Sequence, residues 1–140
     1  MSVSSLSRLV DLREREVDRL SAEVAAKHAV SERYRRNLER MDALCQGSGA
    51  TAVLPPALSL NCGNYKQAVI GMSQLHRQDL ALHEADMAVT QRALTAAARK
   101  HEVFSQLLVR RQDEQRRVVE REEQKRQDEM ATQVWWRSQR

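Results

Sequence analysis

The sequence contains few of the residues that make turns. Its 140 residues include only 4 glycines and 2 prolines, and aromatic residues make up 4%. Sandwiches, barrels and propellers need many tight reversals, which glycine and proline usually supply. We therefore expect long uninterrupted helices rather than a β-rich fold. By its length the chain is expected to form a single domain.

Long apolar runs are also absent. No run of about 18 apolar residues occurs, so a membrane-spanning helix is not expected. The first residues, MSVSSLSRLVDLRERE, are charged and do not resemble a signal peptide. These two absences favour a protein that is made and kept in the cytoplasm.

The few turn-forming residues that do occur are concentrated in one place. Residues 47–63 contain no Asp, Glu, Lys or Arg, and they hold Gly47, Gly49, Pro55, Pro56 and Gly63. This uncharged link separates two arms. We expect one helix at about residues 4–46 and a second at about residues 64–134.

The first arm has an apolar residue at alternating steps of four and three. This spacing of 3.5 residues is typical of a coiled-coil seam. Arg13, Lys27 and Ser31 interrupt the apolar pattern; they either fix the register of the pair or lie where the partner helix is small. The seam positions are Leu6, Val10, Arg13, Val17, Leu20, Val24, Lys27, Ser31, Tyr34, Leu38, Met41 and Cys45.

The second arm begins with a capping pattern and continues the seam. Asn64 with Gln67 three residues later is typical of a capping box, so Asn64 is the expected first cap. The apolar spacing predicts one extra residue, a phase shift, between His76 and Leu80. The expected seam positions are Tyr65, Val69, Met72, His76, Leu80, His83, Met87, Thr90, Leu94, Ala97, His101, Phe104 and Leu108.

The two arms differ in length. At 1.5 Å per residue the first is roughly 60 Å long and the second roughly 105 Å. If the link reverses the chain, the first arm ends opposite about residue 106, where the apolar seam of the second arm also ends. The sequence therefore predicts an all-α fold, a long antiparallel two-helix coiled-coil hairpin with a C-terminal helical overhang. Such a hairpin has little core, so function is expected in what it contacts.

Charge is distributed without a patch of one sign. The chain has 23 Lys and Arg against 19 Asp and Glu, a net charge of +4. Most arginines have an acidic residue within four positions, as in RERE at 13–16. Because a nucleic-acid footprint needs a patch of one sign, nucleic acid is not the expected partner.

Sites for catalysis or cofactors are not evident. The patterns GxxxxGK[ST], GxGxxG, HExxH and GxSxG do not occur. A two-helix hairpin also lacks the concave pocket that catalysis requires, so we expect neither an enzyme nor a cofactor. His76, Asp79 and His83 share one helical face, but a further ligand for a metal is not evident, so aligned polar residues are the better interpretation.

Three features are left without a clear partner. Cys45 and Cys62 bracket the link, and in a cytoplasmic chain two small apolar residues are a better interpretation than a disulfide. Trp135 and Trp136 are either exposed or an anchor for another protein. The apolar segment 52–60 either folds back on the tip of the hairpin or meets another molecule.

Several short motifs in this pattern resemble a known family. They are ERYRRNL at 32–38, the proline-bearing link, NYKQAVIGMSQL at 64–75 and VEREEQKRQDEMATQ at 119–133. Together they resemble the flagellar export protein FliJ family and, more distantly, the type III secretion stalk proteins of the YscO group. The resemblance covers nearly the whole chain.

The resemblance implies a non-catalytic stalk subunit of the flagellar type III export apparatus. Such a subunit would insert into the hexameric export ATPase, promote its assembly or activity, and contact a membrane export-gate protein and export chaperones. It would lie in the cytoplasm at the inner face of the membrane. The alternative is a basic coiled coil that binds nucleic acid or acts as a chaperone-type adaptor through general charge; a peripheral membrane helix is disfavoured because its apolar faces are narrow.

The resemblance also implies two binding surfaces. Contacts with the ATPase would come from the terminal end, at Leu6, Arg8, Val10, Arg13, Arg110, Arg111, Arg116, Arg117, Val118 and Arg121. Contacts with the export gate would come from the hairpin end, at Tyr34, Leu38, Tyr65, Met72 and Leu75. The arginines serve solubility equally well, whereas aromatic and Met side chains suit transient docking.

Overall fold

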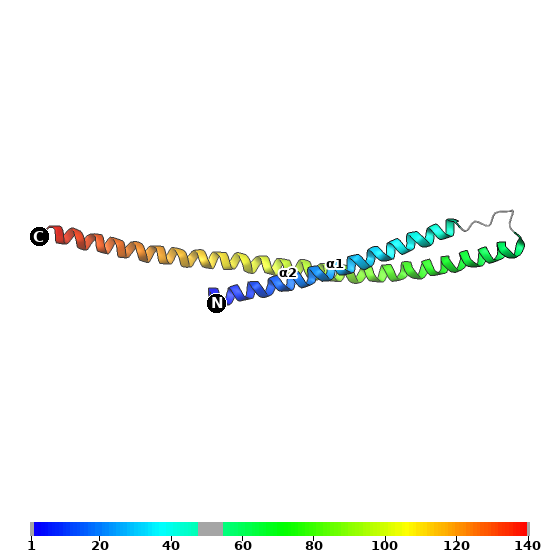
Figure 1. Cartoon of the computed structure of the whole chain (residues 1–140). Coiled ribbons are helices and arrows are strands. Elements are labelled where there is room, and N and C mark those ends of the chain that lie inside the picture. The colour runs from blue at the N-terminus through cyan, green and yellow to red at the C-terminus, as the bar shows by residue number, and fades with distance from the viewer. Residues whose placement is uncertain (1, 48–54, 140) are drawn as a thin grey trace. The chain divides into compact units, whose positions relative to one another are not determined.

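The computed structural model describes residues 2–47 and 55–139 and contains two long helices in them. α1 spans Val3–Gly47 and α2 spans Pro56–Ser138, and they pack against each other as a helical hairpin (Figure 1). The expected all-α fold is confirmed. Contacts divide the chain into a terminal unit, Met1–Val17 with Ala96–Arg140, and a central unit, Asp18–Thr95.

Both helices begin at a recognisable start signal. Ser2 caps α1, because its Oγ accepts a hydrogen bond from the backbone N–H of Ser5 at 3.1 Å. α2 begins at Pro56 and not at Asn64, so the expected cap at Asn64 is wrong. Proline suits the first helical position, where its missing N–H would have no partner. Of the expected link at 47–63, residues 48–54 lie outside the described part of the chain.

Ion pairs in the central unit fix the direction and register of the helices. Arg35 bonds Glu84 at 2.7 Å, and one heptad further along α1 Asp42 bonds Arg77 at 3.1 Å. Because the α1 number rises by seven while the α2 number falls by seven, the helices are antiparallel. In this register Gly47 lies opposite about residue 72. The first turns of α2 therefore extend beyond the end of α1 (Figure 1).

The seam expected for α1 is confirmed by burial. None of its positions is exposed, and Leu6, Leu20 and Ser31 are at most 7% exposed. In α2 the positions from His76 to Leu108 are likewise buried or half-buried.

The expected phase shift in α2 is wrong. Ser73 is 4% exposed and occupies the seam, whereas Tyr65 and Met72 are 49% and 57% exposed. With Val69, Ser73, His76 and Leu80 the steps are four, three and four, so the seam is regular. The apolar pattern pointed to Met72 instead of Ser73 because a seam position is usually apolar. Ser73 can occupy the seam because it is small and its hydroxyl donates a hydrogen bond to the Ile70 carbonyl at 2.9 Å.

In the terminal unit α2 is longer than α1. Ser2 and Val3 line a surface hollow together with residues between Arg111 and Val119. The N-terminal end of α1 therefore lies opposite this stretch of α2 and not opposite about residue 106. Every described residue of α2 from 120 onward is exposed. The expected C-terminal overhang is therefore present, but it begins later in α2 than expected. The helix continues to Ser138 and not to about residue 134.

Candidate functional site

Exposed arginines dominate the terminal unit. Arg8, Arg110, Arg111, Arg116, Arg117 and Arg121 are all exposed. Two of them are held by acidic residues one turn away on α2: Arg111 bonds Glu114 at 3.2 Å and Arg116 bonds Asp113 at 3.1 Å. Exposed pairs of this kind contribute little to stability, about 0.2 to 1 kcal/mol each, and exchange readily. These arginines can therefore turn from a neighbouring carboxylate to another molecule at small cost.

Arg13 differs from the other arginines because it lies in the seam. Its guanidinium donates to Glu16 at 2.7 Å, while its Nε is buried without a hydrogen-bond partner. It borders an apolar hollow together with Val103 and Phe104 of α2. The structure thus places Arg13 as part of the helix pair and less as an exposed contact.

The apolar residues among the expected ATPase contacts differ in how far they are exposed. Leu6 is 2% exposed and Val10 is half-buried, so both join α1 to α2. Val118 is 51% exposed and lines the hollow beside Val3. Val118 therefore leaves apolar surface open at the place where the overhang begins.

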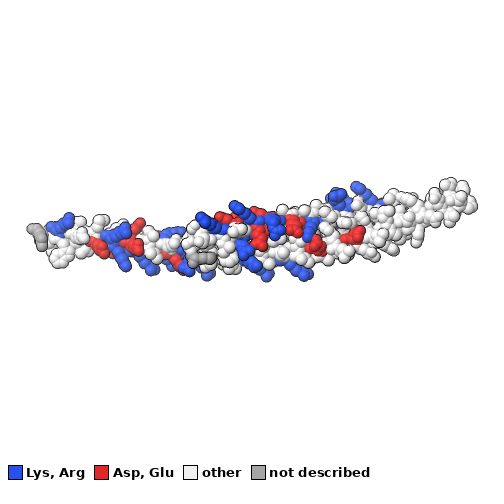
Figure 2. All heavy atoms as spheres, turned by 90° about the horizontal axis from the view of Figure 1, so that it is seen from below, with Lys and Arg blue, Asp and Glu red and all other residues white. Residues whose placement is uncertain are grey.

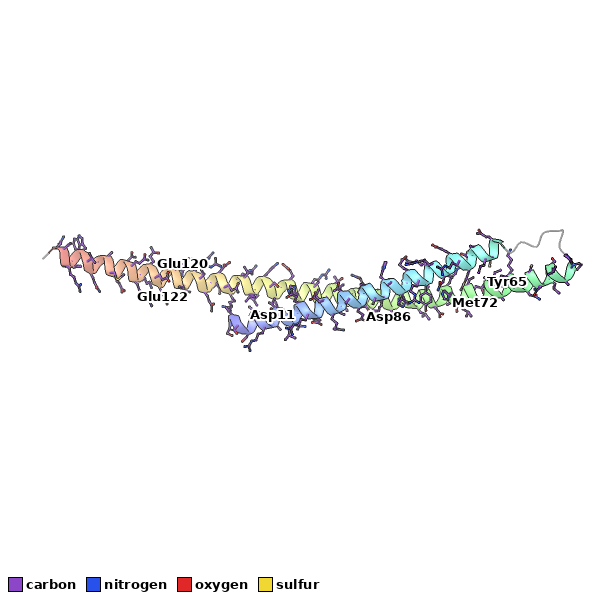
Figure 3. The ribbon with its side chains drawn as sticks, in the orientation of Figure 1. Asp11, Tyr65, Met72, Asp86, Glu120 and Glu122 are labelled. Atoms are coloured by element: carbon purple, nitrogen blue, oxygen red, sulfur yellow. The ribbon has the colours of Figure 1, made fainter. Side chains whose placement is uncertain are left out.

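A cluster of polar side chains interrupts the seam of the central unit. The Lys27 ammonium bonds Asp86 at 2.7 Å, Thr90 Oγ1 at 2.7 Å and Glu23 at 3.3 Å. Hydrogen bonding to Asp86 raises the pKa of Lys27 above its ordinary value, and the same bond lowers the pKa of Asp86. The expected interruption at Lys27 is thus a charged link between the helices. Figure 3 labels Asp86 on α2 beside α1.

Three rings lie next to this cluster. Tyr34 of α1 lies 4.8 Å from the ring centre of His76 and 6.0 Å from that of His83. His83 Nε2 lies 2.8 Å from the Lys27 carbonyl oxygen, and His76 Nε2 is buried without a partner. Asp79 is exposed, and the described residues contain no group of three or more His, Cys, Asp or Glu that could hold a metal ion.

The residues proposed for the export gate fall into two groups. Tyr34 and Leu38 are half-buried in the seam. Tyr65, Met72 and Leu75 are 49%, 57% and 64% exposed on α2, where Figure 3 labels the first two. Only this second group offers open apolar surface for a partner.

The remaining candidates are also located. Cys45 and Cys62 are free thiols, both half-buried. Trp135 and Trp136 are 54% and 65% exposed, with their rings edge to face at 5.6 Å. In segment 52–60, residues 52–54 lie outside the described part, and Leu58 and Leu60 are exposed.

Sequence reasoning missed the pairs that fix the register. Arg35 with Glu84 and Asp42 with Arg77 lie on the edges of the seam, where coiled coils place their interhelical ion pairs. Counting opposite charges along the two seam edges could have found them, but only with the register already known. It also missed the exposed Leu82.

Charge and apolarity of the surface set the kind of contact that the molecule can make. Figure 2 shows basic and acidic side chains interspersed on the visible face, while the first turns of α2 carry no charge before Lys66. Among the described residues, neither helix has a stretch long and apolar enough to cross a membrane.

Comparison with known proteins identifies the family. No curated protein and no solved structure gave a significant match. The family described as "Flagellar FliJ protein" matches residues 1–140, the whole chain. That family is a non-enzymatic component of flagellar export, and a fold of two long helices fits such a component. The chain therefore belongs to the FliJ family of flagellar proteins.

Proposed function

We propose that this chain is a non-catalytic stalk subunit that couples the hexameric flagellar export ATPase to the membrane export gate and to export chaperones. The terminal unit inserts into the ATPase ring and promotes its assembly or activity. The exposed apolar residues at the beginning of α2 contact the gate. The protein acts in the cytoplasm at the inner face of the membrane.

The observation that carries this proposal is the overhang in a chain of this family. From residue 120 to Ser138 a single helix is exposed on every side, as the segment around Glu120 and Glu122 illustrates (Figure 3). A lone helix is narrow enough to enter a ring. Its charges alternate in sign, so contacts with a ring wall would be numerous and individually weak, which permits rotation or sliding.

The exposed arginines extend this surface onto the paired part of the terminal unit. Arg110, Arg111, Arg117 and Arg121 lie on α2 before and at the start of the overhang, and Arg8 lies on α1. Guanidinium groups bind carboxylates in two-pronged geometry. We therefore infer that acidic residues of the ATPase meet these arginines.

The proposal is tested by ATP hydrolysis of the purified export ATPase with and without this chain. Truncation after Val119 removes the overhang but leaves the residues of α2 that line the hollow beside Val3. Stimulation of hydrolysis is expected to fall toward the basal rate. Circular dichroism checks that the truncated chain stays helical, and undiminished stimulation would rule out insertion of the overhang.

A charge variant tests the arginines separately. Arg117→Glu with Arg121→Glu is expected to weaken stimulation. The matched control is Arg36→Glu with Arg92→Glu, two exposed arginines of the central unit, which should stimulate like the unaltered chain. Equal loss in both double variants would mean that only general charge matters.

The salt dependence of binding tests the alternative of a basic adaptor. Binding through general charge collapses steeply between low and physiological salt and does not select its partner. Titrating salt against duplex DNA and against the ATPase separates the two functions. We expect binding to the ATPase to persist at physiological salt and binding to DNA to be absent.

A further inference from the structure

A second heptad stripe follows the exposed side of α2 in the central unit. Its steps alternate between three and four residues, as in the seam with α1. All its members are exposed, and Tyr65, Met72, Leu75 and Leu82 are 49%, 57%, 64% and 72% exposed. The outer stripe consists of Leu58, Asn61, Tyr65, Ala68, Met72, Leu75, Asp79 and Leu82.

The position of the outer stripe leaves room for another helix. Successive helical residues turn by about 100°, which places the centre of the stripe about 100° around α2 from the seam. Helices of a four-helix bundle have neighbours on two such sides. The stripe also begins in the turns of α2 that extend beyond Gly47, where α1 is no longer opposite (Figure 1).

The spacing of the stripe identifies its occupant as a helix, because knobs-into-holes packing repeats every 3.5 residues. The stripe is complementary to an antiparallel copy of itself when residue 70 of one helix lies opposite residue 70 of the other. Leu58 faces Leu82, Tyr65 faces Leu75, and the small Ala68 faces the large Met72. Asn61 faces Asp79, so the polar layer is also matched.

Other registers match less well. Sliding the second helix by one heptad in one direction places Asn61 opposite Met72, and sliding it in the other places Asp79 opposite Ala68. Each buries a polar group against an apolar one, which is costly. On its outer edge the stripe is bordered by Asn64, Gly71, Gln78 and Ala85, which are uncharged and bring no repulsion between copies.

We infer that the outer stripe is an antiparallel self-association surface, on which α2 of one copy packs against α2 of a second copy. Such a two-fold contact requires each residue and its counterpart to exchange roles, as Ala68 and Met72 do. The paired stripe is about 36 Å long. It covers Tyr65, Met72 and Leu75, so the dimer would also hide the surface proposed for the export gate.

Sedimentation equilibrium of the purified chain tests the association without the ATPase or gate, so its outcome is independent of the proposed function. We expect a monomer–dimer equilibrium, and Met72→Asp should weaken it about a hundredfold because a carboxylate would be buried. Val103→Asp is the matched control, since Val103 is 63% exposed on the same helix but outside the stripe. Circular dichroism confirms that both variants remain helical.

Spin labels distinguish the antiparallel arrangement from a parallel one. Gly63 and Gly71 have open space where a Cβ would stand, so Gly63→Cys and Gly71→Cys can carry labels in a Cys45→Ser, Cys62→Ser background. Antiparallel pairing about residue 70 offsets the two labels along the axis by about 3 Å at position 71 and about 21 Å at position 63. Parallel pairing in register has no axial offset at either position, so the label separation at position 63 would lack the axial component of about 21 Å.

Three results would overturn the inference. They are a chain that stays monomeric at concentrations near 0.1 mM, a dimer that Met72→Asp leaves intact, and a dimer whose label distance at position 63 lacks the axial offset of about 21 Å. A monomer that binds the gate protein through Met72 would assign the stripe to the gate alone.

Discussion

Replacing Ser31 with alanine is expected to stabilise the protein. Ser31 is 1% exposed in the seam of the central unit, and its hydroxyl has no hydrogen-bond partner. A helical serine often donates to the carbonyl four residues earlier. Here that carbonyl, of Lys27, also lies 2.8 Å from His83 Nε2, and it accepts the helical N–H as well, so its lone pairs are used.

The magnitude follows from two effects of the same sign. A buried polar group without a partner costs about 1 to 3 kcal/mol, and alanine exceeds serine in helix propensity by about 0.5 kcal/mol. Loss of a few packing contacts offsets part of this gain. We expect Ser31→Ala to raise the free energy of unfolding by about 1 to 2 kcal/mol and the Tm by about 3 to 8 °C.

Ser73→Ala is the matched control for this prediction. Ser73 is also buried in the seam, at 4% exposed, but its hydroxyl donates to the Ile70 carbonyl at 2.9 Å. Its loss of a satisfied hydrogen bond and its gain in helix propensity nearly cancel, within about 0.5 kcal/mol. Thermal and urea unfolding followed by circular dichroism measure both variants. A Ser31→Ala chain that unfolds more easily than the unaltered one would refute the reasoning.

Two further predictions concern stability. The lowered pKa of Asp86 means that its bond to Lys27 stabilises the fold fully above the ordinary Asp pKa of 3.8 and is lost as the pH falls through the lower folded value. The raised pKa of Lys27 means that the same bond is present below 10.5 and is lost as the pH rises through the higher folded value. The difference in Tm between the unaltered chain and Lys27→Met should therefore be constant between these limits and shrink beyond them. A difference that changes between pH 5 and 9 would contradict this assignment. Leu6→Ala, which empties a position 2% exposed in the terminal unit, should cost about 2 kcal/mol or more, whereas Leu12→Ala, at a position 63% exposed, should cost much less; equal losses in urea unfolding would mean that Leu6 does not join the helices.

The seam of α1 could be predicted from sequence because its apolar residues repeat without competition. Even its polar members, Lys27 and Ser31, are buried or half-buried where the spacing places them. The fold class followed from the same pattern and from the scarcity of turn-forming residues. Local periodicity is therefore enough to define one face of a long helix.

The beginning of α2 could not be predicted in the same way because it carries two stripes. Tyr65 and Met72 belong to the outer stripe, and their apolar character concealed Ser73 in the seam. The register depends on pairs such as Arg35 with Glu84, which are distant in sequence and leave no local signal. The start at Pro56 was missed because proline was interpreted as part of the link and not as a first helical residue.

The exposed candidates for binding could be chosen by residue type, but their accessibility required the structure. Arg13 and Arg117 look alike in the sequence, yet one borders an apolar hollow in the seam and the other is exposed. Tyr34 and Tyr65 differ in the same way. Burial depends on the partner helix, which a single helical pattern does not contain.

Photo-crosslinking to the assembled export ATPase tests the central claim most directly. A photo-reactive amino acid is placed at the position of Glu122, in the overhang, or at that of Arg92, an exposed position of the central unit. Insertion of the terminal unit predicts crosslinks to the ATPase ring from position 122 and few from position 92. Equal crosslinking from both positions, or crosslinking from position 92 alone, would contradict the account.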